Sequence, residues 1–209
     1  MNRGRIILIS LLIGITLPLY SAQEITFKGG FTRAVMREGQ ETIMLTQGAI
    51  VELGSIRLEA ENIELMGPNS RYLIGTGAVK IGDSENNITI TSNTVSYDRE
   101  LELLLVDGWV EIQDLDNEVI ASGAYLSYNR QEQVMVLQIA AKLLRHTDSG
   151  PMVCRADSIL YDRSNKLLSL IGNSTIRYKG DTYEASSTTV DLESDEIVME
   201  GSISGSIHG

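Results

Sequence analysis

Hydrophobic and polar residues alternate with a period of two along much of the chain. Ile88 and Ile90 alternate with threonines, and Val110 and Ile112 alternate with polar residues. Successive side chains of a β-strand point to opposite faces, so this alternation indicates strands with one buried and one exposed face. Short stretches rich in Asp, Asn, Gly and Ser separate the runs, as is typical of turns. The pattern predicts an all-β protein.

One of these runs predicts which leucines face the interior. Leu101, Leu103 and Leu105 recur at every second position, with Glu100 and Glu102 between them. A strand over this run would place the three leucines on its buried face.

A strand–turn–strand unit repeats with a period of about 31–33 residues. The segments "TVSYDRELELLLVDG", "AYLSYNRQEQVMVLQ" and "SILYDRSNKLLSLIG" place Tyr97, Tyr128 and Tyr161 at equivalent positions. One period holds two strands and two turns, so the repeats predict a stack in which each unit contacts only its neighbours. A glycine follows the turn in most copies and predicts a bend or bulge in the strand. These glycines are Gly108, Gly172 and Gly201.

The Tyr-Asp-Arg triplet within the repeat has a structural interpretation. Short polar side chains after the tyrosine are expected to accept hydrogen bonds from the turn backbone. We expect the tyrosines to lie on the inner face at the end of a strand and the arginines to be solvated. The turn-capping residues are Asp98, Asn129 and Asp162, and the arginines are Arg99, Arg130 and Arg163.

The first 22 residues have the features of a secretory signal peptide. Arg3 and Arg5 precede the apolar stretch Ile6–Leu19, and Ala22 offers a small residue for cleavage. The stretch is shorter than the roughly 20 residues of a membrane-spanning helix. We therefore expect residues 1–22 to be cleaved, with a retained anchor as the alternative. Residues 23–40 are expected to form a lead-in, and residues 41–209 a single β-stack domain.

The charge and the single cysteine limit the classes of partner and cross-link. The 209 residues carry a formal charge of -11, and removal of residues 1–22 takes away two arginines. Nucleic-acid binding depends on Lys and Arg neutralising phosphates, so we expect no nucleic-acid partner. Cys154 has no second cysteine to pair with and is expected to be an apolar filler in a strand.

The sequence offers few groups for catalysis or metal binding. It has two histidines and no HExxH or Cys–His pattern, so we expect no metal site and no cofactor. His146, Asp148 and Ser149 are expected to form a polar loop, because sequence neighbours do not make a catalytic triad. No spacing selects a pair of acids for glycoside hydrolysis. We therefore expect no catalytic residues and no enzymatic activity.

The interior of the stack remains open to two interpretations. If its two walls touch, the lining is a closed hydrophobic core. If they separate, the lining forms an apolar trough in which each buried acyl methylene is worth roughly 0.8 kcal/mol. The residues alone leave both alternatives open.

The repeat resembles that of the OstA-like (LptA) family of lipopolysaccharide-transport proteins. The family pattern "A-x-x-x-x-Y-D-x…L-x-G-x-V-x-I" corresponds to "SNTVSYDRELELLLVDGWVEI" and "RADSILYDRSNKLLSLIGNSTI", with "ASGAYLSYNR" as a partial copy. "IMLTQGAIVELGSIRLEAENIEL" is similar to the first segment of the family, and the resemblance extends from about Glu41 to Ser206.

The resemblance implies a stack of antiparallel strands folded into a V-shaped β-jelly-roll. It also implies a periplasmic carrier that holds the acyl chains of lipopolysaccharide or a related glycolipid between its walls. Its partners would be further OstA-like components of the inner and outer membranes. Copies of this chain would also join head to tail. The alternatives are an inner-membrane-anchored member of the same pathway and a structural β-stack with a closed core that binds only protein.

The expected acyl-facing residues are the apolar residues on the inner side of matched strands. They are Ile90, Val95, Tyr97, Leu103, Leu105, Val110, Leu126, Tyr128, Val136, Ile159, Tyr161, Leu170 and Ile176.

Overall fold

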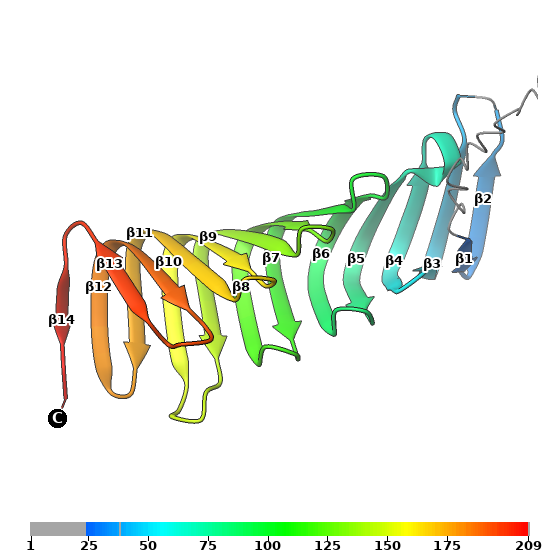
Figure 1. Ribbon diagram of the computed structural model, residues 1–209. Coiled ribbons are helices and arrows are strands. Elements are labelled where there is room, and N and C mark those ends of the chain that lie inside the picture. Colours follow the sequence, from blue (N-terminus) through cyan, green and yellow to red (C-terminus); the bar gives the residue numbers. More distant parts are fainter. Residues whose placement is uncertain (1–23, 38, 209) are drawn as a thin grey trace, which may run out of the picture.

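The computed structural model describes residues 24–37 and 39–208, which form one unclosed antiparallel sheet of 14 strands (Figure 1). The all-β prediction is confirmed. The strands in the first half of the order are β1 (Ile25–Lys28), β2 (Phe31–Val35), β3 (Thr42–Leu53), β4 (Ile56–Met66), β5 (Tyr72–Asp83), β6 (Ile88–Asp98) and β7 (Leu103–Asp114). They are followed by β8 (Val119–Asn129), β9 (Val134–Arg145), β10 (Met152–Asp162), β11 (Leu167–Tyr178), β12 (Asp181–Asp191), β13 (Ile197–Glu200) and β14 (Ser204–Ser206). A short 3-10 helix, η1 (Pro68–Ser70), lies between β4 and β5.

The predicted signal segment, residues 1–22, lies outside the described residues. Within the described ranges, no helix has the length and hydropathy needed to cross a membrane.

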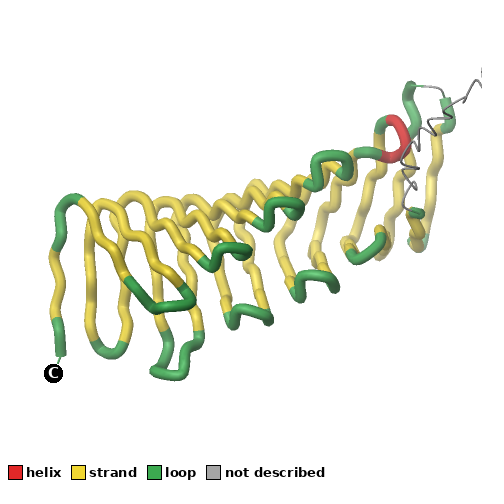
Figure 2. Tube along the Cα trace, in the orientation of Figure 1, coloured by secondary structure: helices red, strands yellow, loops and turns green. Residues whose placement is uncertain are grey.

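Each strand from β3 to β12 is divided by a bend into two halves, and the halves form the two walls of a V. The strand pairing shifts register at this bend in every neighbouring pair of these strands. The half of the sheet that contains residues 103–107 of β7 is called the first wall. The half that contains residues 110–114 is called the second wall. The turns therefore lie in two rows, one along the free margin of each wall (Figure 2). We call the space between these two rows the mouth.

The bend in most odd-numbered strands contains a residue with a left-handed backbone. Gly77, Gly108 and Gly172 have φ values of 80°, 124° and 76°. In β9 the same place is taken by Ile139, with a φ of 62°. Glycine adopts this conformation without steric cost, whereas a β-branched residue does not. The bends predicted at Gly108 and Gly172 are confirmed, and Gly201, with a φ of 87°, lies between β13 and β14.

The core lies between the walls because the inward side chains of both halves are apolar. In β7 these are Leu104 and Val106 from the first wall and Val110 and Ile112 from the second, each at most 2% exposed. Cross-strand pairs align Tyr97 with Leu104 and continue across the first wall as an alternation of tyrosines with Leu or Met. The members of this row are Tyr97, Leu104, Tyr128, Met135, Tyr161 and Leu168.

The stack ends in short strands at both extremities. At the N-terminal end, β1 and β2 both pair with β3, on different halves of it. At the C-terminal end, β13 and β14 pair in the same manner with β12. The lead-in predicted for residues 23–40 thus contributes two strands to the sheet. Exposed apolar side chains lie near both ends, among them Phe31 and Met36 at one end and Ile203 and Ile207 at the other.

Candidate functional site

The candidate site is the apolar interior between the walls, together with the mouth that borders it. Ten of the thirteen predicted acyl-facing residues have buried side chains in this interior, each at most 8% exposed. They are Ile90, Val95, Tyr97, Val110, Leu126, Tyr128, Ile159, Tyr161, Leu170 and Ile176. Their placement in the interior follows the alternation of the sequence, whereas their contact with lipid remains a prediction.

The predicted inward orientation of Leu103, Leu105 and Val136 is wrong, because all three lie on the outer face with intermediate exposure. The inward residues of the same strand halves are their neighbours, such as Leu104 and Met135. Leu101, also expected to face inward, lies in a turn and is 54% exposed.

The physical reason for this shift is the backbone of the turn that precedes each strand. Glu102 and Gln133 end their turns with φ values of 48° and 56°. A left-handed residue changes the chain direction, so the alternation does not continue through it with the same phase. Counting from the preceding tyrosine would have found the inward positions, since Leu104, Met135 and Leu168 each come seven residues after one.

The two walls touch along the interior. The buried apolar residues of both walls form one continuous cluster from β3 to β12, and many of its members are completely buried. In this structure the interior is therefore a closed core, filled by its own side chains. Of the two interpretations left open by the sequence, this conformation corresponds to the closed one.

An ion pair between Arg163 and Asp114 joins the walls at the mouth. Arg163 follows β10 on the first wall, and Asp114 ends β7 on the second wall. The Arg163 Nε donates to Asp114 Oδ2 at 2.7 Å, and the Tyr161 hydroxyl donates to the same oxygen at 2.9 Å. Arg163 also donates to the backbone carbonyl of Asn86 at 2.9 Å. The side chains of Arg163 and Asp114 are only 5% and 0% exposed, so the pair lies away from solvent.

A second pair, between Arg130 and Asp83, repeats this arrangement one unit earlier. The Arg130 Nε donates to Asp83 Oδ2 at 2.8 Å, and its Nη2 donates to Ser55 Oγ at 3.0 Å. The side chains of Arg130 and Asp83 are 9% and 3% exposed. A more exposed third pair joins Arg145 Nη1 to Asp195 Oδ1 at 3.1 Å.

The expectation that the arginines of the triplet are solvated is therefore wrong for Arg130 and Arg163. Their carboxylate partners lie 47 and 49 residues earlier in the chain and reach them only because the V brings the two rows of turns together. The predicted turn caps are confirmed. Asp98, Asn129 and Asp162 each accept a backbone N–H hydrogen bond from the following turn.

The cross-wall pairs keep their carboxylates ionised despite burial. Burial by itself raises the pKa of Asp83 and of Asp114. Hydrogen bonds and charge from Arg130 and Arg163 outweigh burial and hold both pKa values below the usual range of aspartate. The mouth is thus closed by charges that are buried but paired.

Tyr128 places a polar atom between the two pairs without a hydrogen bond. Its hydroxyl is buried and has no partner among the described residues. Tyr97 and Tyr161, two strands away on either side, contact Arg130 and Asp114 respectively. Burial raises the pKa of Tyr128 to about 12. A buried hydroxyl without a hydrogen bond costs about 1–3 kcal/mol. The hydrogen bonding of Tyr128 is therefore less favourable than that of the two ion pairs beside it.

The remaining groups considered in the sequence lie in β10 and in the turn before it. Cys154 is fully buried in β10, as expected of an apolar filler, and burial raises its pKa to about 12. His146 and Ser149 lie in the turn between β9 and β10. Within residues 24–37 and 39–208, no group of three or more His, Cys, Asp or Glu side chains could hold a metal ion.

The fold and the site define a class of protein: an open-ended, V-shaped antiparallel β-stack with a continuous apolar interior. Residues 73–196 match the model of the family described as "LptA/(LptD N-terminal domain) LPS transport protein". The chain belongs to this family.

One solved structure with similarity to this chain is LptH from Pseudomonas aeruginosa, described as the LptA-homologous periplasmic component of the conserved lipopolysaccharide transport device. The two are 16% identical, the match covers 74% of this chain and 95% of LptH, and the TM-score is 0.36. A search among curated proteins found no match.

Proposed function

We propose that this protein is a non-enzymatic periplasmic carrier of lipopolysaccharide or a related glycolipid. In this proposal the acyl chains lie between the two walls and pass along the stack from the inner toward the outer membrane. The observation that carries the proposal is the apolar interior, which continues from β3 to β12 and has its buried ion pairs at the mouth. An amphiphile fits this polarity, with its acyl chains inside and its head group at the mouth.

Lipid binding requires the walls to separate, because their side chains fill the interior of this structure. Separation breaks the Arg130–Asp83 and Arg163–Asp114 pairs. An acyl chain of about 12 methylenes is roughly 10 kcal/mol more stable between the walls than in water, at about 0.8 kcal/mol per methylene. Loss of one partner from a buried pair costs about 3–5 kcal/mol, and charges that return to water at an open mouth lose less. Acyl chains that fill the space would also cover the apolar side chains that separation exposes. A lipid with several acyl chains can therefore offset the cost of separating the walls.

The ends of the stack support head-to-tail assembly with further components of the same fold. Strands β1 and β2 end the sheet at one extremity and β13 and β14 at the other. Exposed edges have free backbone donors and acceptors that can pair with another strand. A contact between one end and the other is heterologous, so it builds an open chain of subunits, which could bridge two membranes.

Site-specific photo-crosslinking in cells tests the carrier function. A crosslinking residue at Leu170 or Ile176, both fully buried in the interior, is expected to capture lipid. A crosslinking residue at Leu105, on the outer face of the same sheet, is the matched control and is expected to capture far less. Mass spectrometry of the adduct identifies the lipid.

The packed walls favour one other function, a structural β-stack that binds only protein. That function predicts that no lipid is captured from Leu170, Ile176 or any other interior position. Protein adducts from the terminal strands, without lipid adducts from the interior, would establish this alternative and reject the carrier.

A further inference from the structure

Three cations lie together on the outer face of the second wall. Lys142 of β9 is directly opposite Arg155 of β10, and Arg177 of β11 is opposite Val153, two residues from Arg155 on the same strand. All three residues are exposed. They form the basic cluster, on a chain whose formal net charge is -11.

The basic cluster lacks the counterions that the mouth has. No ion pair or side-chain hydrogen bond of Lys142, Arg155 or Arg177 is found among the described residues. Like charges directly opposite each other on neighbouring strands are destabilising. Along the same row of the sheet, Ser122 and Thr175 separate Lys142 and Arg155 from the acids on either side. The nearest acid on the same strand is Asp157, two residues after Arg155, and it forms no ion pair with the cluster. The cluster is therefore an exposed positive site that can attract an anion.

The three cations surround a depression in the surface. It measures about 170 Å³ and is lined by the cluster with Val153 and Thr175. This volume is several times the ~30 Å³ that one water molecule occupies in the liquid. A second depression adjoins it and shares Lys142, Arg155 and Thr175.

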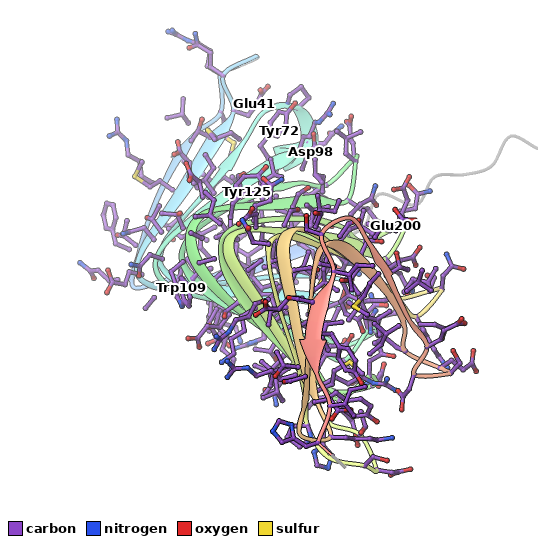
Figure 3. All side chains as sticks on the ribbon, turned by 90° about the vertical axis from the view of Figure 1, so that its left-hand side faces the viewer. Glu41, Tyr72, Asp98, Trp109, Tyr125 and Glu200 are labelled. Carbon is purple, nitrogen blue, oxygen red and sulfur yellow. The ribbon has the colours of Figure 1, made fainter. Side chains whose placement is uncertain are left out.

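The second depression leads from the basic cluster toward the bend of the sheet. Its lining includes Trp109 and Ala140. Trp109 is 55% exposed and points away from the sheet at the outer surface (Figure 3). Asp157, also in this lining, accepts a hydrogen bond from Asn173 at 2.8 Å. The two depressions together form a continuous surface, with the basic cluster at one end and the apolar side chains of Trp109 and Ala140 at the other.

We propose that Lys142, Arg155 and Arg177 bind a phosphate group of a phosphate-bearing ligand. Guanidinium groups donate paired hydrogen bonds that match phosphate oxygens, and an ammonium group adds a point charge. The site lies outside the V and does not require the walls to separate. It therefore goes beyond the proposed transport function, which concerns the interior.

Binding measurements on the purified protein from residue 23 to residue 209 test this site. The probes are lipopolysaccharide, the same lipopolysaccharide after enzymatic removal of its phosphates, and inorganic phosphate. Arg155→Gln removes the central cation. It is expected to weaken about tenfold the phosphate-dependent part of lipopolysaccharide binding, which is the part lost on dephosphorylation, because one charge-assisted contact is lost. Lys142→Gln is expected to weaken it similarly, and raised ionic strength is expected to weaken binding to the wild-type protein.

Lys80→Gln is the matched control. Lys80 is an exposed cation on the outer face of the same wall, and its cross-strand neighbour is Glu59. Its replacement is expected to leave binding of every probe unchanged. A circular-dichroism melt of each variant checks that these exposed substitutions preserve the fold.

The outcomes separate this proposal from the transport function. Weaker binding of intact lipopolysaccharide only in the cluster variants, with dephosphorylated lipopolysaccharide bound equally by all variants, supports a lipid phosphate as the ligand. Cluster-dependent binding of inorganic phosphate, without such a difference for lipopolysaccharide, supports a free phosphate. Equal effects of Arg155→Gln and Lys80→Gln, or no dependence on phosphate, overturn the proposal, even if crosslinking at Leu170 still captures lipid.

Discussion

Arginines occur in two opposite settings on this sheet. Arg163, at the mouth, is buried and paired with Asp114, whereas Arg155, on the outer face, is exposed and has Lys142 directly opposite it. The first setting uses charge to join two walls of one chain. The second leaves charge available to a ligand. The comparison shows that the position in the V, rather than the residue type, decides what an arginine does here.

The largest expected effect comes from breaking the buried setting. Arg163→Gln leaves Asp114 buried without its charge partner and is expected to lower the free energy of unfolding by about 3–5 kcal/mol. Urea denaturation followed by circular dichroism measures the change. The double variant Arg163→Gln/Asp114→Asn removes both charges and is expected to recover most of the loss. A double variant as unstable as the single one would contradict the view that the unpaired carboxylate is the cause.

A pair of substitutions in β7 tests which face of the strand is buried. Leu104→Ala, in the core, is expected to cost about 2–5 kcal/mol because it leaves a cavity. Leu105→Ala, on the outer face, is expected to cost less than about 1 kcal/mol, since the residue is already partly solvated. Thermal or urea unfolding of both variants compares them directly. Equal losses would show that the assigned phase of the strand is incorrect.

Acid is expected to lower the stability of the fold by protonating the buried aspartates at the mouth. The pKa values of Asp83 and Asp114 are lower in the folded chain than in the unfolded one, where aspartate titrates near about 3.9. Their contribution to stability is therefore complete above that value and is lost as the pH falls through the lower folded pKa values. Unfolding measured between neutral pH and about pH 2 should show this loss. The variant Arg163→Gln/Asp114→Asn should lose less stability in acid than the wild type.

A smaller effect is expected at the bend of β9. Ile139 is 64% exposed and has the left-handed backbone that glycine adopts in β5 and β11. Ile139→Gly should raise the free energy of unfolding by about 1 kcal/mol, because it removes the strain at little loss of burial. Ile139→Ala keeps the Cβ and is expected to gain less. A destabilised glycine variant would show that the exposed isoleucine packs against the bend more than its exposure indicates.

The smallest effect on stability is expected in the exposed setting. Arg155→Gln should change the free energy of unfolding by no more than about 0.5 kcal/mol, as an exposed substitution away from special features does. Relief of the repulsion from Lys142 makes a slight gain the expected sign. A loss as large as that of Arg163→Gln would remove the distinction between the two groups of arginines.

Much of the fold could be predicted from the sequence because its signals are local. The period-two alternation located strands such as β6, and the repeated Tyr-Asp-Arg turn set the length of the unit. Ten interior residues followed from the same alternation. The phase after the turns was not predictable from alternation alone, since it depends on the left-handed backbone of residues such as Glu102 and Gln133.

The mouth could not be predicted, because its contacts are not local. Asp83 and Asp114 lie at strand ends that resemble any other polar turn in the sequence. They come to lie opposite Arg130 and Arg163 only when the sheet folds into the V. The basic cluster was equally hidden, since Lys142, Arg155 and Arg177 are far apart in the chain and become neighbours only through the strand register.

The regular repeat also makes the protein modular in length. Each unit adds two strands, and neighbouring strands lie about 4.8 Å apart, so one unit extends the stack by roughly 10 Å. Within the part of the chain that the structure describes, the terminal strands pair with β3 and β12 and not with the units between them. A chain with one unit more or fewer would therefore keep both of its ends while changing the distance between them. The length of such a protein is set by its number of repeats. That length can change while the surfaces that contact its neighbours stay the same.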